Sequence, residues 1–449
     1  MRLGAFIVSF LLFAAGQASL QLHVVEKKIK VNGKEALVYA IEGPDGKPGL
    51  ELNQAEMFDV NVINTLDVPT VLHWHGLILP NKDDGAAFVT QFLIYPGLSY
   101  LYQFPLLQTG TFWMHSHVGL QEQRLLAAPL IIYGPEDSSM ANQEVVVLLA
   151  DFSFRDSEQI YADWQCGDKK MKKGEPDVVE IEYDAFLANS RTLEDPTLFE
   201  VEPGSKVRLR IINGASATNF FVSLGNLSGE AIAIDGHRIE PLQGNHFELA
   251  IAQRIDIIVA IPDRGGAFPI LMQGEWTKKQ TGIVLATKKA PIPKLSSKLK
   301  AKAGILTNKQ EARLRALYPL PSKPVDRKIL MTLEGGMMAN VWTINGRAWP
   351  EVTPPIIEEG QRVAITFKNE STMSHPMHLH GHVFEVTEID GQSFRGAMRD
   401  TVLVTPQSSV TIEFDANNPG VWPVHCHLLY HMEAGMFTVI RYKDFIQPL

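Results

Sequence analysis

The chain has 449 residues, a length typical of about three domains. It carries 41 Lys and Arg against 50 Asp and Glu, a net charge of −9, so no broad basic surface points to nucleic acid as a partner. Hydrophobic residues make up 45% and charged residues 20% of the chain, which indicates a globular and not a disordered protein. Its two cysteines, Cys166 and Cys426, exclude a disulfide framework.

The first residues predict export. Met1 and Arg2 form a short positive start, residues 3–15 are an apolar run, and small residues around Ala18 suit cleavage. The run is shorter than the roughly 20 residues of a membrane span. We therefore predict a signal peptide over residues 1–18 and a periplasmic or extracellular protein without stable membrane insertion.

A strand-like pattern occurs three times. Apolar residues alternate with polar ones up to Asn64, Asn213 and Asn369, which are 149 and 156 residues apart. Alternation with period two is typical of half-buried β-strands. The pattern predicts an all-β protein with three β-sandwich domains, over residues 20–138, 140–290 and 327–449.

A basic stretch separates the second and third repeats. Residues 288–328 contain 12 Lys and Arg, with only Glu311 and Asp326 as acids. We interpret residues 291–326 as a solvated linker that is helical around residues 310–317. Binding of an acidic partner is the alternative.

Eight of the 14 histidines lie at matching places in the outer repeats. Five His-x-His pairs occur, where a random distribution predicts fewer than one: 73/75, 115/117, 378/380, 380/382 and 425/427. His73 and His378 each lie nine residues after the repeated asparagine, a place that Val222 takes in the middle repeat. The middle domain is thus predicted to keep the fold without the histidines.

Side chains at i and i+2 of a strand point to the same face, so each pair presents two imidazoles together. Imidazole is a common ligand of transition metals. Four of the pairs predict a cluster of three metal ions between the first and third domains, surrounded by His73, His75, His115, His117, His378, His380, His425 and His427.

Cys426 lies between His425 and His427 and should point to the opposite face of the strand. The equivalent residue in the first domain is Ser116, so a thiolate-bound metal is expected in the third domain alone. His375, His431 and Met436 complete the two His, one Cys and distant Met of a blue-copper electron-transfer site.

These motifs resemble the four copper motifs of the multicopper oxidases over nearly the whole mature chain. They are His73-Trp74-His75-Gly76, His115-Ser116-His117, residues 375–381 and residues 425–436. Residues 183–189 and 427–436 are similar to the bacterial copper-resistance branch of the family, with laccases as wider relatives.

The resemblance implies three cupredoxin-like Greek-key domains and four coppers, with no cofactor besides copper. His375, Cys426, His431 and Met436 would hold the type 1 copper, and His73 and His378 the type 2 copper. The type 3 pair would be bound by His75, His115, His117, His380, His425 and His427.

The implied activity couples one-electron oxidation of a small donor at the type 1 copper to four-electron reduction of O2 to water at the trinuclear cluster. Cys426 would carry the electrons to the cluster. The donor is a phenol or Cu(I), and we expect a monomer. A copper-sequestering protein with little turnover and a metal-free structural protein are the alternatives.

Two further residues match the family pattern. Asp84 matches an acid that relays protons, against an ordinary Asp-Gly turn as the alternative. Met373 matches a methionine that binds substrate Cu(I) in cuprous oxidases, but core packing competes with that role, and Ser371 replaces the expected acid. Met432 follows His431 where relatives often carry a second acid, so a second proton relay is in doubt.

The other residues receive ordinary interpretations. An axial Met436 predicts a low-to-middling type 1 potential. We expect His382 to hydrogen-bond behind the ligands, Cys166 to be an inert buried thiol, and Asp400 to pair with Arg399. No role is assigned to His23, His237 and His246.

Overall fold

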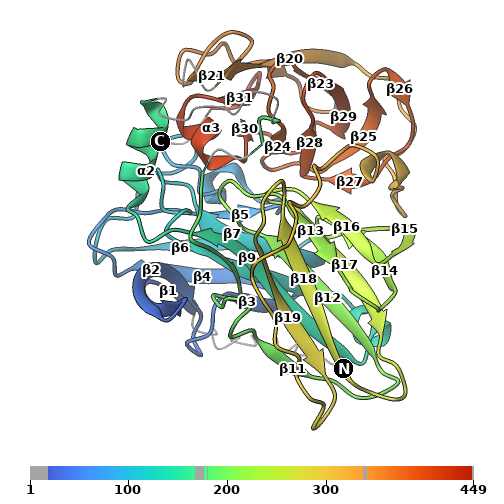
Figure 1. Cartoon of the computed structure of the whole chain (residues 1–449). Helices are drawn as coiled ribbons and strands as arrows, with labels where there is room; N and C mark the ends of the chain where they lie inside the picture. Colours follow the sequence, from blue (N-terminus) through green and yellow to red (C-terminus); the bar gives the residue numbers. More distant parts are fainter. Residues whose placement is uncertain (1–18, 167–175, 179–180, 337–340, 447–449) are drawn as a thin grey trace, which may run out of the picture.

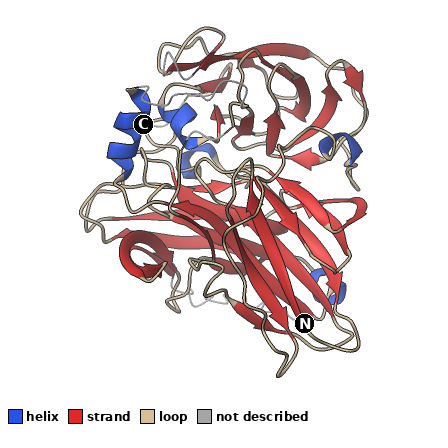
Figure 2. Cartoon of the chain, viewed as in Figure 1, coloured by secondary structure: helices blue, strands red, loops and turns tan. Residues whose placement is uncertain are grey.

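The computed structural model describes residues 19–166, 176–178, 181–336 and 341–446, so the predicted signal peptide lies outside the described residues. Strands dominate the part of the chain that is described, and they form six sheets (Figures 1 and 2). The sheets group in pairs along the chain into three sandwiches. The predicted all-β, cupredoxin-like fold class is therefore confirmed.

The first sandwich comprises β1–β8. One sheet has the order β2-β1-β4-β6, with bounds Lys34–Glu42, Leu20–Val31, Met57–Asn64 and Ser99–Pro105. The other has the order β3-β8-β7-β5, with bounds Leu50–Asn53, Ala127–Tyr133, Gly110–Ser116 and Leu72–His75. A short 3-10 helix, η1 (Asn81–Asp83), follows β5.

The second sandwich comprises β9–β19. One sheet runs β10-β9-β12-β17-β14-β15, with bounds Ala185–Ala188, Gln143–Phe152, Lys206–Asn213, Arg254–Ala260, Gly229–Ile234 and His237–Gly244. The other runs β11-β19-β18-β13-β16, with bounds Leu198–Glu200, Gln280–Ala286, Ala267–Gly274, Phe220–Ser223 and His246–Leu249. Helix α1 (Asp137–Met140) precedes β9, and α2 (Ser157–Gln165) follows it.

The third sandwich comprises β20–β31 and covers one end of the other two (Figure 1, orange to red). One sheet runs β21-β20-β23-β29-β25-β26, with β27 beside β25; its bounds are Val341–Ile344, Arg327–Gly336, Arg362–Asn369, Ser409–Asp415, Phe384–Ile389, Gln392–Ser393 and Met398–Arg399. The other runs β22-β31-β30-β24-β28, with bounds Ile356–Ile357, Phe437–Tyr442, Val421–Cys426, His375–Leu379 and Thr401–Val404. Helix α3 (Leu429–Glu433) joins β30 to β31.

The repeated asparagines occupy the same place in each sandwich. Asn64, Asn213 and Asn369 end β4, β12 and β23, which pair in parallel with β1, β9 and β20. All three are buried, and each amide oxygen accepts from the backbone N–H two residues later. The amide nitrogen donates to two backbone carbonyls in Asn64 and Asn213 and to three in Asn369. Since a buried amide needs such partners, the sequence repeat is a repeat of tertiary structure.

The segment between the second and third sandwiches departs from its expectation. Its regular structure is one short 3-10 helix, η2 (Glu311–Arg313), within residues that were expected to be helical over 310–317. Glu311 and Leu314 are buried, and Ala316 bridges to Ile239 of β15. The segment is therefore partly packed between sandwiches and not wholly solvated, because several of its apolar residues and Glu311 are buried there.

Candidate metal centres

Equivalent strands of the first and third sandwiches carry the paired histidines. His73 of β5 lies opposite His115 of β7, and His378 of β24 lies opposite His425 of β30. Between His73 and His75, Trp74 points the other way and packs on Phe58 and Tyr102, with ring centroids 4.6 and 4.9 Å apart. The strand alternation thus separates a core face from an imidazole face, as predicted.

All eight predicted cluster histidines are buried and lie together between the two sandwiches. His73 Nε2 is 3.5 Å from His378 Nε2, and His115 Nε2 is 3.4 Å from His427 Nε2. Their nitrogens form triplets that could each hold a metal ion: His73, His75 and His378; His75, His115 and His427; and His117, His380 and His425.

Hydrogen bonds on the outer nitrogens decide which nitrogen faces the cluster. His73 Nδ1 donates to the Asp84 carbonyl at 2.7 Å, and His378 Nδ1 donates to the Asp400 carbonyl at 2.8 Å, so both turn Nε2 inward. His75 is reversed, since its Nε2 donates to Asp400 Oδ1 at 3.0 Å. Within the described residues, His75 Nδ1 and His117 Nε2 are buried without a hydrogen-bond partner, as expected of atoms reserved for a metal.

Three buried carboxylates surround the cluster, and each contacts one histidine from either sandwich. Asp84 Oδ2 accepts from His380 Nδ1 at 2.9 Å, and Asp84 Oδ1 lies 3.3 Å from His73 Nδ1. Asp400 Oδ1 contacts His75 at 3.0 Å and His378 at 3.8 Å. The structure therefore places the predicted Asp84 at the cluster.

Glu122 is the third of these carboxylates and was missed in the sequence. Its Oε2 lies 3.0 Å from His115 Nδ1, and its Oε1 lies 3.9 Å from His427 Nδ1. Glu122 follows β7 and no alternation marks it, so the available signal was only its place five residues after His117. The structure thus places an acid at the cluster from a segment other than the one that carries Met432.

The expected Asp400–Arg399 ion pair is wrong. Asp400 pairs with Arg254 of β17 through two hydrogen bonds of 2.7 and 2.6 Å. Arg399 instead pairs with Asp235, at 2.9 Å, and with Glu311. Arg399 ends β27 and Asp400 lies in the bend before β28, so the two neighbouring charges reach different partners.

Burial controls the ionisation of the cluster. It lowers the pKa of His75, His115 and His380 well below the ordinary value, with the neighbouring imidazoles adding to the effect. The pKa of His425 falls to about 3, again mainly through burial. Burial raises the pKa of Glu122 well above the usual range. Neutral imidazole is the form that binds metal, so the site is prepared for a cation.

Cys426 points to the opposite side of β30 and meets a second set of ligands. Its Sγ lies 3.6 Å from His375 Nδ1 and 3.7 Å from His431 Nδ1, and these two nitrogens are 3.1 Å apart. All three side chains are fully buried. One thiolate and two imidazoles at these separations suit a single copper ion.

Two neighbours hold this second site and were not recognised in the sequence. Ser371 Oγ lies 2.7 Å from His375 Nε2 and can accept a hydrogen bond from its N–H, which leaves Nδ1 of His375 for a metal. Trp342 of β21 stacks on His431 with ring centroids 3.7 Å apart and is itself buried. No donor molecule can therefore touch the His431 ring on the face that Trp342 covers.

The two methionines predicted as site residues, Met373 and Met436, are both buried. The backbone carbonyl of Met436 accepts from Cys426 N–H at 3.1 Å, and its N–H donates to the His431 carbonyl at 2.9 Å, so its main chain joins the two ligands. Met373 is 1% exposed within the main core. This burial favours its packing role over capture of Cu(I) at the surface.

The remaining residues lie apart from both centres or behind them. His382 Nδ1 donates to the His380 carbonyl at 3.1 Å and its Nε2 lies 2.8 Å from the Tyr442 hydroxyl, in line with the expected supporting role. Cys166 is exposed, so the expected buried thiol is wrong. It caps the C-terminal end of α2.

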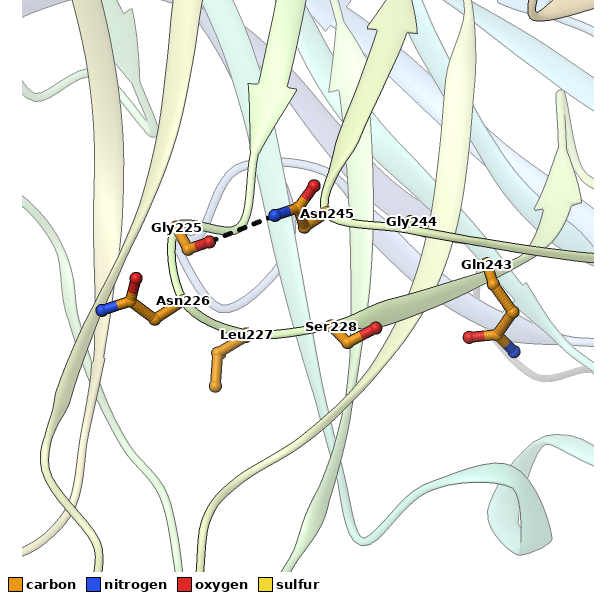
Figure 3. A pocket seen from close by; sticks show the side chains of 7 residues that line it. All are labelled: Gly225, Asn226, Leu227, Ser228, Gln243, Gly244 and Asn245. Atoms are coloured by element: carbon orange, nitrogen blue, oxygen red, sulfur yellow. Dashed lines mark hydrogen bonds between the residues drawn. The ribbon is translucent and has the colours of Figure 1, made fainter.

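An open pocket of the second sandwich contains none of the predicted site residues. Figure 3 shows it in the turns after β13 and β15, lined by Gly225, Asn226, Leu227, Ser228, Gln243, Gly244 and Asn245. Among the described residues, no helix is both long and apolar enough to cross a membrane.

The fold and the site together define a class. The first and third of three cupredoxin-like sandwiches hold a buried eight-histidine cluster between them, and β30 joins that cluster to a second centre made of one cysteine and two histidines. A buried thiolate with two imidazole ligands is typical of a copper protein that transfers electrons.

Comparison with known proteins agrees with this class. Three multicopper oxidase family models match residues 23–137, 143–290 and 322–445. Multicopper oxidase MmcO of Mycobacterium tuberculosis is 33% identical over 85% of this chain and 79% of its own length, and copper resistance protein A of Escherichia coli is 25% identical over 95% and 94%. The laccase structure from Botrytis aclada, 22% identical, shares the fold with a TM-score of 0.79 over 94% of this chain and 86% of its own.

The chain therefore belongs to the multicopper oxidase family. It is a copper-dependent oxidase that uses O2 as the electron acceptor.

Proposed function

We propose that the chain binds four coppers in the arrangement its motifs imply. The carrying observation is that the nitrogen triplets divide as the family assignment requires. Six histidines form two separate triplets, suited to a type 3 pair, and His73 and His378 remain together for a type 2 copper. His375, Cys426 and His431, with Met436 beside them, suit the type 1 copper.

Bound copper would supply one-electron oxidation of the donor and reduction of O2 to water. The chain's own part is to place the two centres on one strand. Cys426 belongs to the type 1 set, while His425 and His427 on either side of it belong to the cluster. The covalent path between the centres is thus the backbone that joins Cys426 to its two neighbours, His425 in β30 and His427 directly after it.

Asp84 is proposed to deliver protons to the cluster. Its Oδ1 has no hydrogen-bond partner within the described residues, although Oδ2 accepts from His380. The Asp84 carboxylate thus lies between His73 Nδ1, 3.3 Å from Oδ1, and His380 Nδ1, which suits a group that passes protons to the cluster. Glu122 stands on the other side of the cluster, against His115 and His427.

The donor is proposed to be small, either Cu(I) or a simple phenol. Trp342 covers His431, and both type 1 histidines are fully buried, so a donor must approach from outside this shell. The buried Met373 supports packing and not a donor site. We further propose export through residues 1–18 and a monomeric state.

Oxygen consumption by the copper-loaded protein tests the function. Cu(I) and a methoxyphenol are compared at equal concentration, with Cys426→Ser as the inactive control. Uptake of about one O2 per four electrons supports the oxidase. Faster turnover with Cu(I) assigns a cuprous oxidase, and preference for the phenol assigns a laccase. Copper binding without uptake for either donor contradicts both assignments.

A further inference from the structure

A row of buried charges connects the second sandwich to the histidine cluster. The charges alternate in sign and come from the linker, the third sandwich and the second sandwich: Glu311, Arg399, Asp235, Arg254 and Asp400. All five side chains are at least nine-tenths buried. Buried charges are retained only when they are paired and hydrogen-bonded, so the row must be ordered as a unit.

Arg254 is the member that joins all three sandwiches. Its guanidinium donates to both oxygens of Asp400 in the third sandwich, at 2.7 and 2.6 Å. Its Nε donates at 3.0 Å to the carbonyl of Thr111, on the strand that carries His115 in the first sandwich. Asp235 of the second sandwich accepts the Arg254 backbone N–H at 2.9 Å and faces Arg399 at 2.9 Å.

Asp400 is the link from Arg254 to the ligands. Its Oδ1 accepts from His75 Nε2 at 3.0 Å and from the Thr401 hydroxyl at 2.9 Å, and its carbonyl accepts from His378 Nδ1. With Nε2 of His75 engaged outward, the unpartnered Nδ1 is the atom left for the cluster. A carboxylate that can rotate would not hold His75 in this orientation, and the two-point contact with Arg254 prevents the rotation.

Gly76, which follows His75, shows how closely the Arg254–Asp400 ion pair packs against the backbone. Gly76 has φ +89°, and a Cβ there would lie 2.5 Å from both the Arg254 guanidinium and the Asp400 carboxylate. No other residue type leaves this space. The Arg254–Asp400 pair is therefore built against the backbone of the His75 motif itself.

We propose that Arg254 is a positioning residue through which the second sandwich, which supplies none of the predicted copper ligands, holds the type 2 and type 3 ligands in binding geometry. The inference rests on the proposed copper assignment. Arg254 acts through Asp400 on His75 and His378. The Cys426 centre, which uses none of these contacts, is independent of it.

The test is copper occupancy of the two centres in Arg254→Gln and Arg254→Lys. The copper content and the EPR signal of the type 2 copper report on the cluster, and the blue absorption of thiolate-bound copper reports on the Cys426 centre. Arg208→Lys is the matched control, because Arg208 is 2% exposed and paired with Asp256 away from the histidines.

We expect Arg254→Gln to weaken copper binding at the cluster by about 10–100-fold with the blue copper retained. Arg254→Lys, which keeps the charge but not the two-point contact, should lose less, and Arg208→Lys should match the wild type. Cluster copper unchanged in both Arg254 variants overturns the inference. If Arg254→Gln loses the blue copper as well, the result for Arg254→Lys is decisive. Equal copper loss at both centres of Arg254→Lys overturns the inference, and copper loss at the cluster alone supports it. A wild type without cluster copper instead contradicts the proposed function.

Discussion

Strands β7 and β30 have the same backbone hydrogen bonding, but β7 carries a serine where β30 carries a cysteine. The N–H of Ser116 in β7 donates to the Leu126 carbonyl at 3.0 Å, and the N–H of Cys426 in β30 donates to the Met436 carbonyl at 3.1 Å. Both residues stand between two cluster histidines. The two strands are thus equivalent places where one residue decides whether a second metal can bind.

The surroundings of the two residues match position by position. Thr70 and Gln121 lie in the first sandwich where His375 and His431 lie in the third, counted from the paired histidines. Ser116 and Thr70 both donate to Gln121 Oε1, at 2.7 and 2.8 Å. The first site is a closed hydrogen-bond network, whereas the second is a set of soft and imidazole ligands. One fold carries either set, so side chains alone decide which of these two sites could hold a thiolate-bound metal.

The second sandwich shows a third outcome. Val222 of β13 pairs with Met272 of β18, and both are fully buried. Val222 stands where His73 and His378 stand in the other sandwiches. Val222 and Met272 fill the core with apolar side chains, so no imidazole is present at this position to bind a metal.

The largest effect is expected when β30 is given the residue of β7. Cys426→Ser should abolish the blue absorption and reduce oxidase turnover to background, since a hydroxyl is not a copper(II) ligand comparable to a thiolate. Copper at the histidine cluster should remain. Metal analysis with visible spectroscopy measures both, and retention of the blue band would show that Cys426 is not the ligand.

Acid should weaken the copper-free protein. Burial lowers the folded-state pKa of seven cluster histidines, His75, His115, His117, His378, His380, His425 and His427. Below the ordinary pKa of about 6.5 the unfolded chain binds protons that the folded chain does not, so the free energy of unfolding decreases as pH falls. Urea unfolding at pH 7.5 and pH 5 tests this. Equal stability at the two pH values would contradict the lowered pKa values.

A smaller change concerns the axial position. Leu126 stands in the first sandwich where Met436 stands in the third, so Met436→Leu again transfers a residue between the equivalent sites. We expect a higher type 1 reduction potential with the blue colour kept, because the thioether stabilises oxidised copper. Redox titration measures the potential, and an unchanged value would exclude Met436 as the axial ligand.

The smallest effect is expected from the reverse exchange. Ser116→Cys should leave the copper content unchanged, since Thr70 and Gln121 provide no imidazole. Loss of the Ser116 hydrogen bonds should lower the free energy of unfolding by about 1–3 kcal/mol. Chemical denaturation with copper analysis tests both expectations. A new blue band would mean that a cysteine suffices at this position.

Several features could be predicted from local pattern. Alternation with period two located the strands and separated the imidazole face of β5 from the face of Trp74. The spacing from Asn64 and Asn369 to the histidines identified the two matching sandwiches and the one without ligands. These features depend on residues within about ten positions of one another, where backbone geometry alone decides which side chains share a face.

Contacts between distant segments could not be predicted in this way. Asp400 was assigned to its neighbour Arg399 but pairs with Arg254, Glu122 was not recognised as the second acid at the cluster, and Cys166 is exposed instead of buried. The sequence alone determined which histidines share a face and that Cys426 faces away from them, because their spacing follows from strand periodicity. Only the tertiary structure decided what orients those ligands, because a buried charge takes whichever partner the packing of three sandwiches brings within hydrogen-bond reach.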